Sequence, residues 1–259
     1  ELKGRNIELS YRDSTFLDCD FDLSGLPEID NTFIYIGVNS LNISSYDVSK
    51  IYIPEKGTII LPDILKKLGY ISFNGNFTGF TTDFVTFGKM TSSTGNISTD
   101  VSFRPKGRGG YKIKGIVNGQ GIALGKLTGE EDMLGSLSMK ANLDMYASSL
   151  KAFSGSMSGL IDSVEINDYK YRNISLNGTF SEHTWDGSVK ISEPNIKMDL
   201  LGMFDFSGQL PEFDFTLNLA EADLYRLKLA KDTSAEVSVL LTANFKGSNI
   251  DNLDGEIKL

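Results

Sequence analysis

Apolar and polar residues alternate along most of the 259-residue chain. In residues 137–145 the odd positions are leucine, methionine or alanine, and the even positions are serine, lysine, asparagine or aspartate. The same parity organises residues 17–23, 213–219 and 237–245. Because successive side chains of a strand point to opposite faces, each segment is predicted to be a strand with one apolar and one polar face.

Short turn signals divide these runs, and they predict antiparallel hairpins. With roughly 8 to 12 residues for each strand and its turn, the chain should hold on the order of 20 strands. Glycines within the strand parity, such as Gly75, Gly115 and Gly202, indicate bends in a curved sheet. The predicted turns are Asn74-Gly75, Thr94-Gly95-Asn96, Asn118-Gly119, Asn177-Gly178, Asp186-Gly187 and Asp254-Gly255.

Helical periodicity is almost confined to two short segments. Residues 62–69 begin with proline and end with glycine, which predicts one or two helical turns, and residues 222–227 suggest a second. Neither segment is long enough to cover a large sheet. We therefore predict an all-β chain in which residues 1–259 form one elongated, curved antiparallel sheet with one or two helical turns.

The apolar strand faces need a covering, and the pattern leaves two interpretations open. Either two faces pack together as the dry core of a β-sandwich, or one sheet forms a U-shaped trough with an apolar interior that is open to a guest. Large flexible side chains at the inward positions suit either arrangement. The predicted lining residues are Leu137, Met139, Leu143, Met145, Met198, Phe204, Phe206, Phe213, Phe215, Leu217, Leu219, Val237, Val239 and Leu241.

Composition narrows the chemistry that the chain can perform. One cysteine excludes an internal disulfide, and one cysteine with one histidine leaves little from which to build a zinc, haem or iron-sulfur site, so no cofactor is expected. A formal charge of −9 without a basic stripe argues against a nucleic-acid partner.

The chain has no run of about 18 apolar residues, so we expect no membrane-spanning helix within it. It begins at Glu1 and ends at Leu259 inside an alternating pattern, which we interpret as a segment of a longer chain.

Four local features invite a catalytic or metal-binding interpretation, and each is weak. Asp18, Asp20 and Asp22 resemble the start of a calcium loop, but the required glycine and glutamate are missing, so a solvated strand face is favoured. His183 is predicted to lie in a hairpin turn, and no helix follows the Gly155–Gly159 serine motif. Cys19 alternates in phase with apolar residues and is predicted to be a small core residue.

From about Val164 to Leu259 the chain resembles the TamB/AsmA-like proteins of Gram-negative bacteria, in particular their Bacteroidetes forms. The order of several short motifs carries the resemblance. These motifs are Tyr169 to Phe180, Trp185 to Ile191, Glu193-Pro194-Asn195, Gly202 to Gly208, Phe213 to Leu219, Ala222 to Leu227 and Ala243 to Gly255.

The resemblance implies a long β-taco with a hydrophobic interior, tethered by an N-terminal inner-membrane helix and reaching across the periplasm. Such proteins act as bridges for phospholipid between the two membranes, and the TamB branch is also linked to outer-membrane protein assembly with a β-barrel partner. We therefore expect a non-enzymatic, periplasmic segment that carries phospholipid acyl chains and supports outer-membrane biogenesis. Two alternatives remain: an assembly scaffold that pairs its sheet edge with client strands, and an extracellular β-sandwich binding module.

Overall fold

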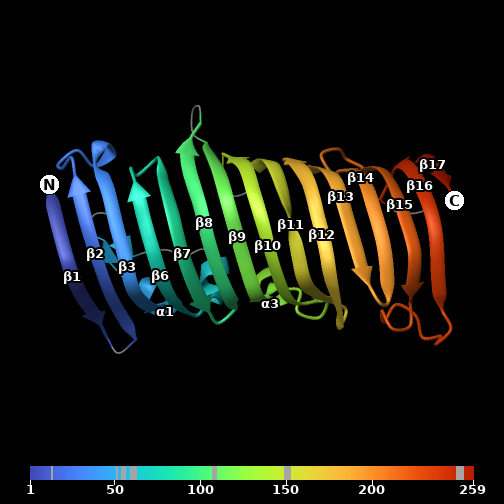
Figure 1. The fold of residues 1–259 in the computed structure, drawn as a ribbon, viewed down its shortest axis with the longest axis horizontal. Coiled ribbons are helices and arrows are strands. Elements are labelled where there is room, and N and C mark those ends of the chain that lie inside the picture. Colours follow the sequence, from blue (N-terminus) through green and yellow to red (C-terminus); the bar gives the residue numbers. More distant parts are fainter. Residues whose placement is uncertain are drawn as a thin grey trace.

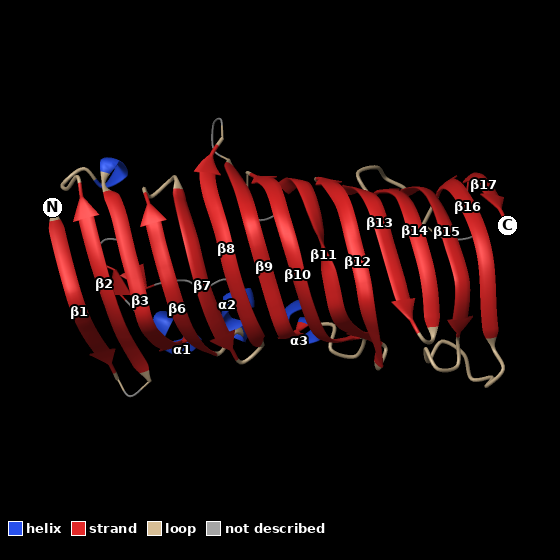
Figure 2. Cartoon of the chain, in the orientation of Figure 1, coloured by secondary structure: helices blue, strands red, loops and turns tan. Residues whose placement is uncertain are grey.

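The computed structural model is an elongated, nearly all-β molecule (Figures 1 and 2). It describes residues 1–12, 14–50, 52–53, 57–58, 63–106, 110–148, 153–248 and 254–259. In this described part, fifteen strands form one antiparallel sheet in the order β1-β2-β3-β6-β7-β8-β9-β10-β11-β12-β13-β14-β15-β16-β17, and β4 pairs with β5. Each main strand therefore pairs with its neighbours in sequence, as expected for a chain of consecutive hairpins.

The strands of the main sheet are mostly 9 to 14 residues long, apart from the short last one. Their bounds are β1 Leu2–Tyr11, β2 Thr15–Ser24, β3 Phe33–Ser44, β6 Tyr70–Gly79, β7 Phe84–Ser92, β8 Gly95–Pro105, β9 Tyr111–Ala123, β10 Leu134–Ala147, β11 Phe153–Ile166, β12 Tyr169–Ser181, β13 Thr184–Glu193, β14 Ile196–Asp205, β15 Glu212–Asp223, β16 Glu236–Lys246 and β17 Asp254–Lys258. The separate pair is β4 Tyr52–Ile53 and β5 Gly57–Thr58.

The helices are short and lie behind the sheet along its lower edge in Figure 2, apart from the single turn η1 (Ile29–Asn31) near the upper edge. They are α1 (Ser45–Val48), α2 (Asp63–Lys67) and α3 (Leu124–Thr128). Lys67 Nζ donates a hydrogen bond to the Leu127 carbonyl at 2.9 Å, which links α2 to α3.

The predicted helical turn near 62–69 is confirmed as α2, although Pro62 lies outside the described residues. The second predicted turn, 222–227, is shorter than expected and forms no helix. Ala222 and Asp223 belong to β15, and residues 224–228 form a turn in which the Leu227 amide donates a hydrogen bond to the Asp223 carbonyl at 3.0 Å and Leu227 is buried. The sequence pattern also missed α1 and α3, each of which is too short to show a helical period.

The main sheet is one open layer, with β1 and β17 at opposite ends of the molecule (Figure 1). The described strands do not form the two facing sheets of a sandwich. The chain exposes 16243 Å², whereas a compact protein of 28.4 kDa exposes about 11,000 Å². The larger exposed area is expected for an open layer, because a sheet face that packs against no second sheet stays in contact with solvent.

Most of the predicted hairpin turns are wrong. Thr94-Gly95 does join β7 to β8, but the pairs at Asn74, Asn118, Asn177, Asp186 and Asp254 lie within strands. In each of these pairs the asparagine or aspartate lies on the polar face and the glycine on the apolar face. At these positions the absence of a side chain allows a neighbouring strand to lie close, and no turn is formed.

Close approach of neighbouring strands explains two of these glycines. Gly178 pairs with Gly187, which pairs with Gly202 on the next strand. A Cβ on Gly187 would overlap the Asn177 carbonyl oxygen and lie 2.5 Å from the Cα of Gly178, and the Trp185 ring covers both glycines. Glycine-aromatic packing of this kind allows a sheet to bend while its apolar face stays covered.

Candidate apolar binding face

Four rows of residues cross the sheet on one face, and they are apolar almost throughout. Each row passes from strand to strand between directly paired residues, and the rows cross β10 at Met145, Leu143, Ala141 and Met139. Directly paired residues point to the same side of a sheet. Among the described residues of these rows, Thr86 and Thr99 are polar and none is charged. We call this surface the apolar face.

The first row crosses all fifteen described strands of the sheet. Its members are Leu2, Leu23, Ile34, Gly79, Phe84, Phe103, Ile113, Met145, Gly155, Phe180, Trp185, Phe204, Phe213, Phe245 and Gly255. Aromatic rings are in contact along it: the ring centroids of Trp185 and Phe204 are 5.4 Å apart, and those of Phe213 and Phe245 are 4.9 Å apart. These spacings are typical of packed aromatic pairs.

The structure brings the sequence-predicted lining residues together on this face. Eleven of the fourteen lie in the four rows: Met139, Leu143, Met145, Met198, Phe204, Phe213, Phe215, Leu217, Leu219, Val239 and Leu241. Leu137 and Val237 lie one step further along the same strands, paired with Val164 and Ala222. Phe206 follows the end of β14 and packs on Phe213 with ring centroids 5.8 Å apart.

The predicted lining residues leave out the part of the apolar face formed by β1 to β9, although residues 17–23 were predicted to form a strand with one apolar face. There the same rows pass through large side chains such as Phe21, Phe77 and Phe73. The signal was present, since Phe21 and Phe77 have the same alternating neighbours as the residues of the second half.

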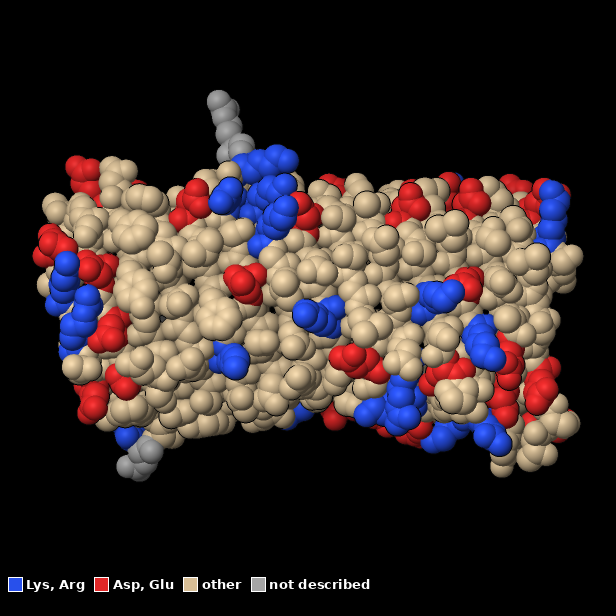
Figure 3. Space-filling model, in the orientation of Figure 1, with Lys and Arg blue, Asp and Glu red and all other residues tan. Residues whose placement is uncertain are grey.

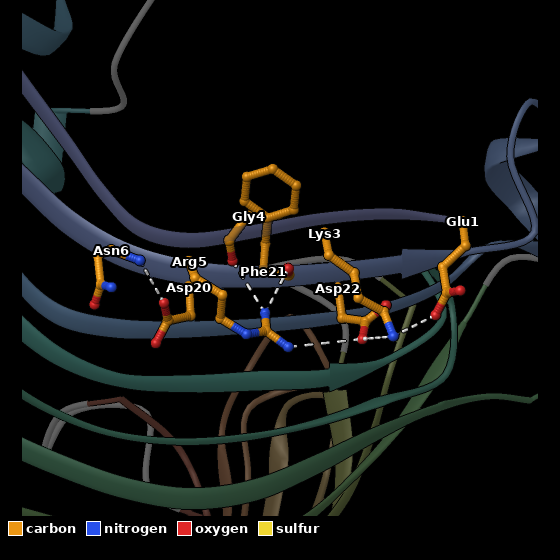
Figure 4. A network of polar contacts seen from close by, with 8 residues as sticks. All are labelled: Glu1, Lys3, Gly4, Arg5, Asn6, Asp20, Phe21 and Asp22. Carbon is orange, nitrogen blue, oxygen red and sulfur yellow. Dashed lines mark hydrogen bonds and ion pairs between the residues drawn. The ribbon is translucent and has the colours of Figure 1, made fainter.

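Side chains of the apolar face are half-buried rather than sealed. Twelve of the fourteen predicted lining residues are partly exposed, and Phe206 and Val237 are exposed by 57% and 37%. In Figure 4 the nearest strands bend toward the side on which the Phe21 ring lies. The face is therefore on the concave side of these strands, where neighbouring side chains shield one another without a covering layer.

One long edge of the apolar face carries the main hydrophobic cluster. Leu227, from the turn after β15, is 1% exposed and packs in a cluster of Val164, Ile174, Ile191, Ile196 and Ala222. The hydroxyl of Tyr169 donates to Glu193 Oε1 at 2.9 Å and accepts from Asn195 Nδ2 at 3.0 Å in the same region. The cluster includes Ile174 and Ile191 of the fourth row and residues beyond that row, so the first row lies nearest the opposite edge.

The opposite face of the sheet, the polar face, carries most of the charged side chains of the strands, with exposed apolar side chains such as Phe87, Leu201 and Leu240 among them. Charged side chains are scattered over it among uncharged ones (Figure 3). It also has shallow depressions, one of them of about 500 Å³ between residues such as Ser188, Leu201 and Thr216. These depressions are open to solvent, so they offer no enclosed site.

The aspartates of the calcium-like motif lie on this polar face, as the alternative interpretation predicted. Asp22 forms ion pairs with Lys3 at 3.3 Å and Arg5 at 3.9 Å, and Asp20 accepts a hydrogen bond from the Asn6 amide at 2.7 Å (Figure 4). Asp18 accepts from Asn39 Nδ2 at 3.2 Å. In the described residues no group of three or more metal-binding side chains is arranged around a common point.

The other candidate residues have structural positions. Cys19 is buried between strands in the third row, and this burial raises the pKa of its thiol. His183 lies in the turn between β12 and β13, as predicted. The Gly155–Gly159 motif lies inside β11, so no nucleophile elbow forms there. No helix of the described chain is long and apolar enough to cross a membrane.

Comparison with known proteins provides no relative from which a function follows. No protein-family model, no curated protein and no solved structure matches the chain. The resemblance to the TamB/AsmA-like proteins therefore stays a hypothesis, and any function must be argued from the apolar face itself.

Proposed function

We propose that the apolar face carries the acyl chains of phospholipids along the length of the sheet. The single observation that carries the proposal is the continuity of the four rows, which hold no charged side chain in the described strands. A charge in a row would be costly for an acyl chain to pass, because its hydration would be lost.

The proposed mechanism is passive partition. Each CH2 group removed from water contributes about 0.8 kcal/mol, so a chain that moves from one strand to the next loses little contact with the face. Fourteen steps between the fifteen described strands, at about 4.8 Å each, give a track of about 67 Å. Energy and direction come from outside this segment.

The proposed setting follows from the resemblance to the TamB/AsmA-like proteins. The chain is then a periplasmic segment of an envelope-spanning protein, anchored in the inner membrane by a helix outside this sequence. Its role is non-enzymatic and supports outer-membrane biogenesis, with a β-barrel assembly protein as a further partner. Neither catalysis nor a cofactor is part of this proposal.

Photo-crosslinking with lipid mass spectrometry tests the proposal directly. A photoreactive residue replaces Met139 or Phe215 on the apolar face, and Asn142 or Thr216 on the polar face serves as the matched control. We expect phospholipid adducts at the first two positions and none at the controls. Purified protein without lipid, and without adducts at Met139 or Phe215, would contradict the proposal.

A charge placed in the third row tests passage along the face. Leu217→Asp should block lipid transfer between vesicles while the protein stays folded, because Leu217 is only half-buried and the carboxylate keeps access to water. Thr216→Asp, on the polar face of the same strand, should leave transfer unchanged. Unfolding of the Leu217 variant alone, seen by circular dichroism, would indicate a closed core and would count against an open face.

The scaffold function has one observation in its favour. In the described sheet β1 pairs with β2 alone, so its outer edge offers backbone groups to a client strand. The edge is poorly shaped for this, because β1 contains an irregularity between Gly4 and Ile7 and carries Lys3 and Arg5. Crosslinks confined to β1 with an outer-membrane client would favour the scaffold.

A further inference from the structure

Four basic residues gather at one end of two adjacent strands, β8 and β9, on the polar face. Arg104 pairs across the sheet with Lys112, and Lys114 lies in the next row of that face, while Lys106 follows the end of β8. We call Arg104, Lys106, Lys112 and Lys114 the basic rim. Figure 3 shows a dense group of basic side chains at the upper edge of the molecule.

The basic rim holds more positive than negative charge. Lys112 and Lys114 share one carboxylate, Asp144, at 2.9 and 3.6 Å, and Arg104 Nε lies 3.9 Å from Asp83. Four cations less these two carboxylates leave an excess of two positive charges. Elsewhere the balance is reversed, because the whole chain carries −9.

Aromatic side chains accompany the basic rim. The Tyr146 ring lies against Gly110, where a Cβ would overlap the ring, and Lys106 Nζ is 5.6 Å from the ring centroid. Tyr111, at the start of β9, is 38% exposed and lies at the same strand end on the apolar face, two positions before Ile113. Tyrosine and lysine together are typical of surfaces that meet the headgroup region of a bilayer.

The position of the basic rim makes it accessible to a flat partner. The end of β8 reaches beyond the neighbouring strand ends at the upper edge of the sheet (Figure 1). The Arg104 and Lys114 side chains are 70% and 67% exposed, so they reach an external surface without rearrangement.

We propose that the basic rim docks onto the surface of a bilayer that contains anionic phospholipids. The excess positive charge attracts the headgroup phosphates, and the tyrosines insert at headgroup level. Nucleic acid offers the same phosphates, but the rim is a projecting strand end with tyrosines beside it, which fits a flat surface with an apolar interior better than a nucleic-acid strand. This docking is independent of acyl-chain transport on the apolar face.

Vesicle flotation tests the docking. The protein is mixed with vesicles of phosphatidylcholine alone or with added phosphatidylglycerol, and the floating fraction is measured. We expect binding to the phosphatidylglycerol vesicles only, and we expect salt to weaken it, because the screening length falls from about 10 Å at 0.1 M to about 3 Å at 1 M salt. This salt titration requires no variant.

A charge-removal variant assigns the binding to the rim. Arg104→Gln, Lys106→Gln and Lys112→Gln together leave Lys114 to pair with Asp144 and should reduce affinity by about tenfold or more. The matched control removes three lysines elsewhere on the polar face, Lys140→Gln, Lys190→Gln and Lys197→Gln, and should bind as the unchanged protein does.

Several results would overturn the proposal. These are equal binding to both kinds of vesicle, equal loss in the control variant, or tighter binding to a short DNA duplex than to the vesicles. Binding that is insensitive to salt but lost in Leu217→Asp would place the contact on the apolar face. Loss of lipid transfer in Leu217→Asp with unchanged flotation would separate the two proposals.

Discussion

Glycine residues on the apolar face are required because the next strand or an aromatic ring occupies the space that a side chain would need. At Gly187 the backbone of β12 lies so close that a side chain would overlap it, and Trp185 occupies the space above. The same arrangement recurs at Gly88, where the Phe73 ring occupies the space that a Cβ would need. Single residues of this kind therefore control how closely two strands approach.

Gly187→Val should lower the free energy of unfolding by about 2 kcal/mol, because the new side chain displaces Trp185 and separates two strands. Ser188→Val places the same residue on the polar face of β13 and should change stability little. Urea denaturation of both variants measures the difference. Equal stabilities would show that the strands adjust without cost.

Asp47 fastens the first hairpin to α1. Its carboxylate, 3% exposed as a residue, accepts hydrogen bonds from Ser14 Oγ at 2.5 Å and Thr15 Oγ1 at 2.9 Å, and Arg12 Nη1 lies 3.6 Å away. The hydrogen bond from Ser14, followed by that from Thr15, lowers the pKa of this carboxyl below its usual 3.8. The carboxylate form is thus favoured by folding.

The stability that Asp47 contributes should be complete above the ordinary aspartate pKa and should be lost as the pH falls through its lowered pKa in the folded protein. Asp47→Asn should therefore melt at a lower temperature than the unchanged protein at neutral pH, and the gap should close toward strongly acidic pH. Thermal melts at several pH values measure this gap. Asp186→Asn, on the polar face of β13, is the control and should show no such gap.

At the scale of elements, the molecule is a series of hairpins with two kinds of loop. Some loops only connect two strands, and others also cover part of the sheet. The turn between β11 and β12 has two residues, Asn167 and Asp168, both with positive φ, as a tight hairpin requires. The segment between β15 and β16 is longer, and it folds back to cover the end of the apolar face with Leu227. Loops of the second kind supply the cover that long helices supply in other sheets.

Leu227→Ala should lower the free energy of unfolding by about 3 kcal/mol, because the side chain is 1% exposed and its removal leaves a cavity in the cluster. Leu229→Ala, in the same turn, removes a side chain that is 57% exposed and should change stability by about 0.5 kcal/mol or less. Chemical denaturation compares the two. A similar loss in both variants would mean that the turn stabilises the sheet as a whole.

At the scale of the whole molecule, the protein is an extended single-layer sheet and not a compact body with a deep core. A compact chain of 259 residues has a radius of gyration of about 18 Å. An open sheet of fifteen strands, about 67 Å along its strand-to-strand axis, must exceed this value. Each strand is stabilised chiefly by its two neighbours, as in repeat proteins.

Small-angle X-ray scattering should therefore give a radius of gyration above about 20 Å with an elongated distance distribution. The expected value follows from the open layer, because closing the sheet on itself would halve its length. A globular profile near 18 Å would contradict the open sheet. Measurement at several protein concentrations separates elongation from self-association.

Much of the architecture was predictable because strand alternation is a local property. Met139 and Leu217 could be assigned to the apolar face without knowledge of any partner strand, since a period of two fixes relative side-chain direction. The turns were less predictable. Asn177-Gly178 has the sequence of a typical hairpin turn but lies within a strand. The reason for this glycine is its contact with Trp185, which the sequence does not show.

The alternating sequence established which residues share a face and that helices are scarce, and its one cysteine and one histidine leave little from which to build a metal site. It did not decide between a sandwich and an open layer, because both bury alternate residues in the same way. Cross-strand register decided this, by connecting the described strands in one continuous order. The same register aligned four apolar rows and gathered Arg104, Lys112 and Lys114 at one rim, since pairing between strands depends on contacts that no single strand contains.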